Sequence, residues 1–208
     1  MGPFNRTDRP GWQAVSLLAT APIAAFAADG APLPAAAAHS QAERGALVAD
    51  LHRRLLAGQS ATATLEAWCA EHGLADKARV RAVRVQGVDH AAPADVRAAL
   101  QVSADAPLRY RRVQLVCGQR VLSEADNWYV PGLLTAAMNG VLDGSDEPFG
   151  RVVGPLGFQR QTLRDETFWP ARHEGGRSTV LEVRALLRDR AGTPFSYVIE
   201  SYQQQALP

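Results

Sequence analysis

Cysteine is scarce in this sequence, and its histidines stand apart from one another. The 208 residues include two cysteines, Cys69 and Cys117, without a C-x-x-C spacing, and five isolated histidines. Neither pattern supplies the clustered ligands of a zinc site, so we expect no metal. We expect two separately buried thiols, since free cysteine packs as a small hydrophobic group, although one disulfide stays open if the protein is exported.

Signatures of nucleotide binding and of serine hydrolases are also missing. There is no glycine-rich phosphate loop, and Gly144-Ser145-Asp146 lacks the spacing of a G-x-S-x-G nucleophile elbow. The 22 basic and 21 acidic residues are interspersed and give a formal net charge of +1. Without a basic block, nothing predicts nucleic acid or an anionic membrane as a partner.

The N-terminal segment has an uncharged apolar run, but a short one. Arg6 and Arg9 precede residues 14–27, which end in Ala25-Phe26-Ala27. This pattern is typical of a secretory signal peptide over residues 1–27, whereas a membrane-spanning helix needs about 20 apolar residues. We therefore expect a periplasmic or secreted protein with no stable membrane insertion after processing. The alternative is an Ala-rich disordered tail on a cytoplasmic protein.

After a Pro/Ala-rich linker at residues 28–39, residues 40–208 are predicted to form one domain. A hydrophobic content of 47% suffices for one sizeable core. Ser40 and Glu43 form a capping-box pattern that opens a helix. A second helix is predicted from Thr62 to His72, and shorter helices over residues 93–100 and 133–142.

Between these helices the sequence pattern is that of strands. Strand-like runs cover residues 79–85, 108–117, 120–130 and 156–168. Only two residues separate the second and third runs, which predicts an antiparallel hairpin, and the last 30 residues predict another hairpin that turns at residues 189–192. Short connections favour an α+β domain whose sheet is mainly antiparallel, with helices on one side.

Several segments of the C-terminal half resemble the chorismate lyase family. They are LRYRRVQLVCG (108–118), ADNWYVP (125–131), EPFGR (147–151) and the strand PFSYVIESY (194–202). The resemblance implies an antiparallel sheet of about six strands with helical flaps that close a buried pocket. In that pocket chorismate would be converted into 4-hydroxybenzoate and pyruvate without a cofactor.

The resemblance also implies the residues of the site. Arg112 would bind the carboxylate of the substrate, and Glu200 would be the pocket glutamate that orients the ring hydroxyl, both as catalytic residues. Phe149 and Ala61 would contact the ligand through their backbones. Arg151, next in sequence to Gly150, is a further candidate for the pyruvyl carboxylate.

The chemistry suits these residue types. A guanidinium offers two parallel donors to a planar carboxylate and stays charged when partly buried. Without the resemblance, Arg112 would be expected in solvent on a strand face, and Glu200 would be as easily an exposed edge residue as a buried one.

Two alternatives to a lyase remain. An exported, non-catalytic binding protein for an aromatic carboxylate fits the predicted signal peptide better, because chorismate is made in the cytoplasm. The sensor domain of a transcription regulator is the other alternative, but the residues before Ser60 offer one helix, too little for a winged helix-turn-helix. The expected partner is a small molecule, and the chain is expected to be a monomer.

Overall fold

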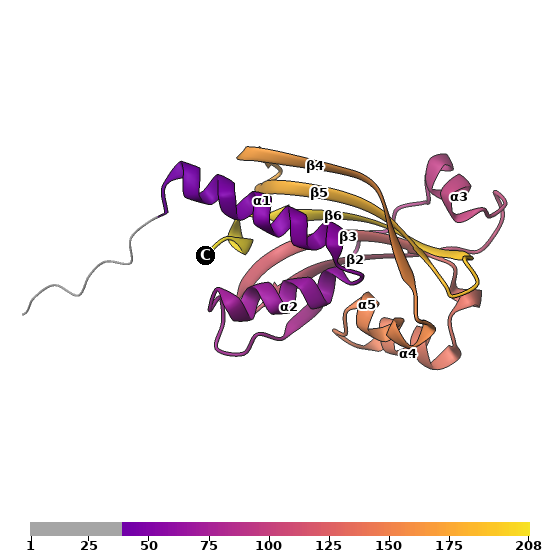
Figure 1. Cartoon of the computed structure of the whole chain (residues 1–208). Coiled ribbons are helices and arrows are strands. Elements are labelled where there is room, and N and C mark those ends of the chain that lie inside the picture. Colours follow the sequence, from indigo (N-terminus) through magenta and orange to yellow (C-terminus); the bar gives the residue numbers. More distant parts are fainter. Residues whose placement is uncertain (1–38) are drawn as a thin grey trace, which may run out of the picture. The chain divides into compact units, whose positions relative to one another are not determined.

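The computed structural model describes residues 39–208. The predicted signal peptide (1–27) and all but the last residue of the predicted linker lie outside the described residues. The described residues contain a six-stranded antiparallel sheet with the strand order β1-β2-β3-β6-β5-β4 (Figure 1). The predicted α+β class with a mainly antiparallel sheet of about six strands is confirmed.

The elements alternate little between helix and strand. The strands are β1 (Val80–Arg84), β2 (Arg109–Cys117), β3 (Arg120–Tyr129), β4 (Gln159–Glu174), β5 (Arg177–Arg188) and β6 (Pro194–Gln203). The helices are α1 (Gln41–Ala57), α2 (Ala61–Glu71), α3 (Ala94–Leu100), α4 (Ala136–Gly144) and α5 (Phe149–Val152), and 3-10 turns cover Pro131–Leu133, Gly154–Leu156 and Gln204–Ala206. Both predicted hairpins, β2–β3 and β5–β6, are present. None of the described helices is long and apolar enough to cross a membrane.

Helices α1 and α2 begin at polar caps. The predicted capping box is present at α1, where Ser40 Oγ accepts a hydrogen bond from the Glu43 amide and the Glu43 carboxylate accepts one from the Ser40 amide. Ser60 caps α2 by accepting from the Ala63 amide, so this helix starts at Ala61, one residue earlier than predicted. These caps fix where α2 begins, which matters because its first turn lines the cavity described below.

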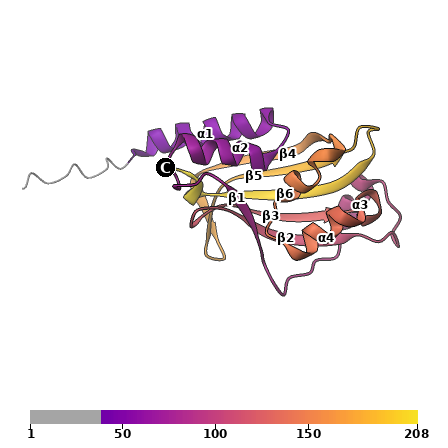
Figure 2. The same ribbon diagram turned by 90° about the horizontal axis from the view of Figure 1, so that it is seen from below.

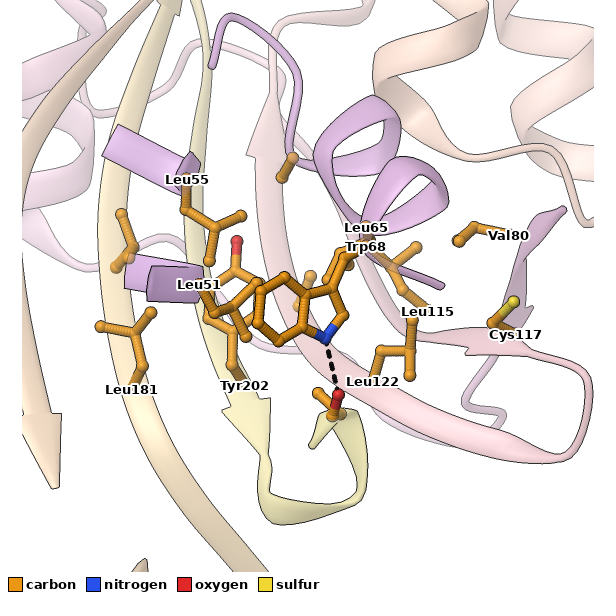
Figure 3. Close-up of a cluster of buried hydrophobic side chains, with 14 of the residues drawn as sticks. Leu51, Leu55, Leu65, Trp68, Val80, Leu115, Cys117, Leu122, Leu181 and Tyr202 are labelled. Carbon is orange, nitrogen blue, oxygen red and sulfur yellow. Dashed lines mark hydrogen bonds between the residues drawn. The ribbon is translucent and has the colours of Figure 1, made fainter. Parts of the chain in front are cut away.

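The main core lies between one face of the sheet and helices α1 and α2 (Figures 2 and 3). Leu51 and Leu55 of α1 and Leu65 and Trp68 of α2 are fully buried there. The indole nitrogen of Trp68 donates to the backbone oxygen of Ala206 at 2.8 Å, so the one polar atom of this large side chain is satisfied inside the core. The contact also ties the C-terminal turn to α2.

Helix α3 packs on the face of the sheet opposite to α1 and α2, so the prediction of helices on one side does not hold for α3. Val96 and Leu100 of α3 bury against Trp128, Leu186 and Tyr197, which project from β3, β5 and β6 on that face. Those three large side chains would otherwise be exposed to water, which explains why a helix covers this end.

Strand β4 is longer than the predicted extended run of residues 156–168. It continues through Trp169-Pro170 to Glu174, and its pairing with β5 is irregular between Thr167 and Arg172. Proline is tolerated here because β4 is an edge strand, where an amide on the open side needs no partner strand.

The expectation of two separate thiols is wrong. Cys69 of α2 and Cys117 at the end of β2, which are 48 positions apart in sequence, form a disulfide, with their Cα atoms 6.7 Å apart. Both residues are fully buried in the main core. The buried face of α2 lies on the end of β2, a tertiary contact that the spacing of two cysteines does not encode.

Loss of this crosslink should destabilise the fold. By the chain-entropy relation, a closed loop of this length lowers the entropy of the unfolded chain enough to stabilise the fold by about 4 kcal/mol. We expect a Cys69→Ser/Cys117→Ser variant to lose about 2–5 kcal/mol of unfolding free energy in urea titrations. Reductant should shift the midpoint of the wild type toward that of the variant and leave the variant unchanged. An unchanged wild-type midpoint under full reduction would contradict the expectation.

Candidate functional site

A cavity of about 50 Å³ lies between the sheet and the first turns of α2 and α5. On a strand, alternate side chains share a face, and β2, β3 and β6 each contribute alternate residues to the cavity. These residues are Arg111, Val113 and Leu115 of β2, Ala125 and Asn127 of β3, and Ser196, Val198 and Glu200 of β6. The opposite wall consists of Gln59, Ser60, Ala61, Thr62, Phe149, Gly150 and Phe158. The cavity thus has a mixed apolar and polar lining.

The first turns of α2 and α5 approach each other closely at the cavity. A Cβ atom added at Gly150 would lie 3.2 Å from Ser60 Oγ, tighter than an ordinary contact, so glycine suits this position. Backbone amides in the first turn of a helix have no partner within the helix and carry partial positive charge. Ala61 and Thr62 occupy that turn of α2 at the cavity, which therefore favours an anion.

Three charged residues line the cavity, and two of them form a buried ion pair. Arg160 of β4 and Glu200 of β6 have side chains only 5% and 7% exposed, and Arg160 Nη2 donates to Glu200 Oε2 at 2.5 Å. Arg160 Nη1 donates to Oε1 at 3.4 Å, and the hydroxyl of Tyr202 donates to Oε2 at 2.9 Å. With Arg111 as the third charged residue, the lining carries two cations and one anion, a formal charge of +1.

The ionisation of this group follows from burial and pairing. Burial is the largest single influence on the pKa of Arg160 and lowers it, but the charge of Glu200, the neighbouring Tyr202 and the hydrogen bond to Glu200 together hold this pKa above its usual value. Burial beside Glu200 raises the pKa of Tyr202 well above that of a free tyrosine. At neutral pH, Arg160 is therefore charged and Tyr202 is a neutral hydroxyl that can donate.

Arg111 is buried with too few partners. It is 3% exposed, and its Nη2 donates weakly to the backbone oxygens of Ser145 and Glu147, each at 3.3 Å. Its Nε and Nη1 are buried and have no hydrogen-bond partner among residues 39–208. Burial lowers the pKa of this guanidinium, with the nearby charge of Arg84 as a smaller cause. A buried cation with unfilled donors is costly, which marks the position as one where an anion would be stabilising.

The structure brings together some of the predicted site residues. Glu200, Phe149 and Ala61 all line the cavity. Arg112 does not, so its predicted meeting with Glu200 in one cavity is wrong. It projects from the opposite face of the sheet, where its Nη2 lies 3.1 Å from Glu124 and its Nη1 lies 3.7 Å from Asp126. The side chain that β2 places in the cavity is its neighbour Arg111.

Arg151 is also outside the cavity. It pairs with Glu66 of α2 and, at 2.6 Å, with Glu147, and it lines a separate groove beside α4. Arg151 lies on α5, and its carboxylate partners are Glu147, just before α5, and Glu66 on α2. It therefore connects α5 to α2. The candidate contact with a pyruvyl carboxylate has no support from this position.

Sequence reasoning missed several polar residues of the cavity, among them Arg111, Arg160 and Asn127. A signal for Arg111 existed, because Val113, Leu115 and Cys117 follow it at alternate positions and mark the inward face of the strand. Asn127 is held by Ser196, whose hydroxyl donates to Asn127 Oδ1 at 2.7 Å, a contact between two strands. Arg160 lies on an edge strand with a largely exposed pattern, and no sequence signal distinguishes it.

Among residues 39–208, no three histidine, cysteine, aspartate or glutamate side chains are grouped so that they could hold a metal ion.

Comparison with known proteins identifies one close relative. The chain is 41% identical over 185 residues to the uncharacterized protein y4mC of Sinorhizobium fredii (strain NBRC 101917 / NGR234), an alignment that covers 81% of this chain and 78% of that protein. No protein-family model matches the sequence.

Similar solved structures are more distant. They include the possible transcriptional regulator YydK of Bacillus subtilis (14% identity, TM-score 0.44, 61% of this chain) and PhnF of Mycobacterium smegmatis (9%, 0.49, 62%). The ligand-binding domain of a GntR-family transcriptional regulator from Bordetella bronchiseptica is similar at 19% identity (TM-score 0.46, 60% of this chain and 85% of that one). The chain spans only 59% of YydK and 60% of PhnF.

The buried ion pair gives a stability prediction. Glu200→Gln leaves the Arg160 charge buried without its counter-charge, so we expect a loss of about 3 kcal/mol or more in unfolding free energy, measured by urea titration. Adding Arg160→Met to that variant should restore much of the loss, because no unpaired charge then remains at this pair.

The matched control for this prediction is an exposed pair on the same strand. Glu166→Gln removes the partner of Arg164, whose side chain is 64% exposed, and should change stability by no more than the measurement error. Equal losses for Glu200→Gln and Glu166→Gln would contradict the buried-pair interpretation.

Proposed function

We propose that this chain, which belongs to the same protein family as y4mC of Sinorhizobium fredii, binds a small aromatic carboxylate in the cavity between α2, α5 and the sheet. The observation that carries the proposal is the buried Arg111 guanidinium, whose Nε and Nη1 have no hydrogen-bond partner within residues 39–208. A carboxylate accepts two parallel hydrogen bonds from adjacent guanidinium nitrogens, so it would fill either Nε or Nη1 together with the weakly bonded Nη2.

Charge balance supports an anionic ligand. Arg160 and Glu200 neutralise each other, and Arg111 leaves one positive charge in the lining. A ligand with a single carboxylate would bring the charge of the occupied cavity to zero. The first-turn amides of α2 add partial positive charge on the same side.

The spacing of the polar residues suits a ring. Arg111 pairs with Asn127, which pairs with Val198, and Glu200 lies two positions further along β6 on the same face. Two strand spacings and two residues along the strand place the Cα atoms of Arg111 and Glu200 roughly 12 Å apart. A benzoate-sized group would lie between their side chains, with Val113, Leu115 and Val198 as its apolar floor, once the cavity is enlarged.

Ligand binding requires the wall to move. A cavity of about 150 Å³ is filled by a benzene ring, which is larger than the cavity of about 50 Å³ present here. The wall opposite the sheet is built from separate segments, Gln59 to Thr62, Phe149 with Gly150, and Phe158, and displacement of these segments from the sheet would enlarge the cavity.

Chorismate lyase activity is the second candidate. Its support is the sequence resemblance together with the burial of Glu200 beside the same cavity as Arg111. The elimination yields an aromatic ring, so the protein would contribute orientation, charge matching and exclusion of water more than acid-base chemistry. Arg111 would hold the ring carboxylate, and Glu200 would orient the hydroxyl.

We also propose that the protein acts in an oxidising compartment, the periplasm or the exterior. The Cys69–Cys117 disulfide supports this, since disulfides persist where thiols are not kept reduced. In that location a binding protein is favoured over a chorismate lyase, because chorismate is made in the cytoplasm. The monomeric state expected from the sequence stays a prediction.

Two neighbouring arginines provide a direct test of binding. We expect Arg111→Met to weaken binding of 4-hydroxybenzoate by about 10- to 100-fold in calorimetric titrations, the value of a charge-assisted hydrogen-bond pair. Arg112→Met, on the opposite face, should bind within about twofold of the wild type, well below the value of one hydrogen bond. Stability should not fall in Arg111→Met, because an under-partnered buried cation is removed. Equal effects of both substitutions, or no binding by the wild type, would overturn the proposal.

Catalysis is tested separately by adding chorismate. If the chain is a lyase, pyruvate and 4-hydroxybenzoate should appear in equal amounts. Pyruvate is measured by a coupled dehydrogenase assay and 4-hydroxybenzoate by its absorbance. Arg111→Met should remove the turnover and Arg112→Met should keep it, since only Arg111 lines the cavity. Binding of 4-hydroxybenzoate without release of pyruvate would leave the binding protein as the function.

A further inference from the structure

The unfilled polar groups of the cavity are mostly hydrogen-bond donors. Arg111 has two unpartnered nitrogens, and Arg160, whose Nη atoms bind Glu200, has a buried Nε without a partner. Asn127 accepts from Ser196 with its oxygen, so its amide nitrogen is the end that remains for a ligand. The first-turn amides of α2 are donors as well.

The acidic acceptor of the cavity is already nearly saturated. A carboxylate has about four lone-pair sites, and Glu200 already accepts two hydrogen bonds from Arg160 and one from Tyr202. At most one site is left for a donor on a ligand. A ligand group that must donate would therefore meet donors on most sides and would stay partly unsatisfied, which is costly in a buried site.

From this inventory we infer that the ligand carries, at the end opposite its carboxylate, a neutral hydrogen-bond acceptor such as a carbonyl or ether oxygen, and that Arg160 Nε selects for it. The inference rests on the proposed binding of an aromatic carboxylate at Arg111 and names the second group of that ligand. The acceptor is neutral because one carboxylate already balances the charge of the lining.

The position of Arg160 suits this role. Arg160 reaches from the edge strand β4 across β5 to Glu200 on β6. Its guanidinium is therefore held at β6, and only β3 separates β6 from β2, the strand that carries Arg111. The bidentate contact with Glu200 fixes the plane of the guanidinium, and with it the direction of the remaining Nε–H. A fixed donor discriminates between ligand groups more sharply than a mobile one.

Three para-substituted benzoates test the inference on the wild-type protein. The 4-formyl group accepts a hydrogen bond, the near-isosteric 4-vinyl group neither accepts nor donates, and the 4-amino group donates. By calorimetry we expect 4-formylbenzoate to bind about tenfold or more tightly than 4-vinylbenzoate, the value of one hydrogen bond from a charged donor. We expect 4-aminobenzoate to bind no more tightly than 4-vinylbenzoate.

The outcomes separate the inference from the function on which it rests. If all three benzoates bind within twofold of one another, or if 4-aminobenzoate binds most tightly, the acceptor preference is refuted while carboxylate binding stands. If none of the three binds, the proposed function itself is refuted.

A variant assigns the preference to Arg160. Arg160→Lys keeps a cation beside Glu200 but removes the fixed Nε donor, so the ratio of the 4-formyl to the 4-vinyl affinity should fall toward one. Arg188→Lys, an arginine of β5 that contacts Gln161 and the Gly192 backbone outside the cavity, should keep the wild-type ratio. The ratio is insensitive to a general loss of structure, which would weaken both ligands alike. An unchanged ratio in Arg160→Lys would overturn the assignment to this residue.

Discussion

A buried imbalance of charge shapes this molecule. Two guanidiniums and one carboxylate line the same cavity over one face of the sheet, and only one guanidinium is matched by a carboxylate. The Arg160–Glu200 pair is tolerated because its two charges and the Tyr202 hydroxyl satisfy one another. Arg111 has no such compensation. Keeping an unmatched cation out of water lowers stability, and proteins commonly retain such costs where a ligand is bound.

The two faces of β2 show how local pattern and global placement differ. Arg111 and Arg112 are adjacent in sequence, yet the first enters the cavity and the second joins a charged network with Glu124 and Asp126 on the far face. The alternation of side chains along a strand predicts that Arg111 and Arg112 lie on opposite faces of the sheet. The apolar residues at alternate positions after Arg111 predict that Arg111 is the one on the buried face. The resemblance to chorismate lyases implied Arg112, whereas Arg111 lines the cavity, and in a strand a difference of one position reverses the face.

Much of the architecture was readable from the sequence. The helix caps, the two hairpins and the predominance of antiparallel strands follow from local rules that the tertiary structure does not override. The disulfide, the cover of the far face by α3 and the reach of Arg160 from an edge strand were not readable. Each depends on which distant segments come into contact, and neither spacing nor periodicity encodes that information.

Helix α2 has one end in the core and the other at the cavity. Cys69 anchors it to β2 near its C-terminal end, whereas Ala61, eight residues earlier, lines the cavity. At the rise of an α-helix these positions are about 12 Å apart. Because the crosslink lies at the other end of the helix, it constrains the first turn at the cavity only through the length of α2.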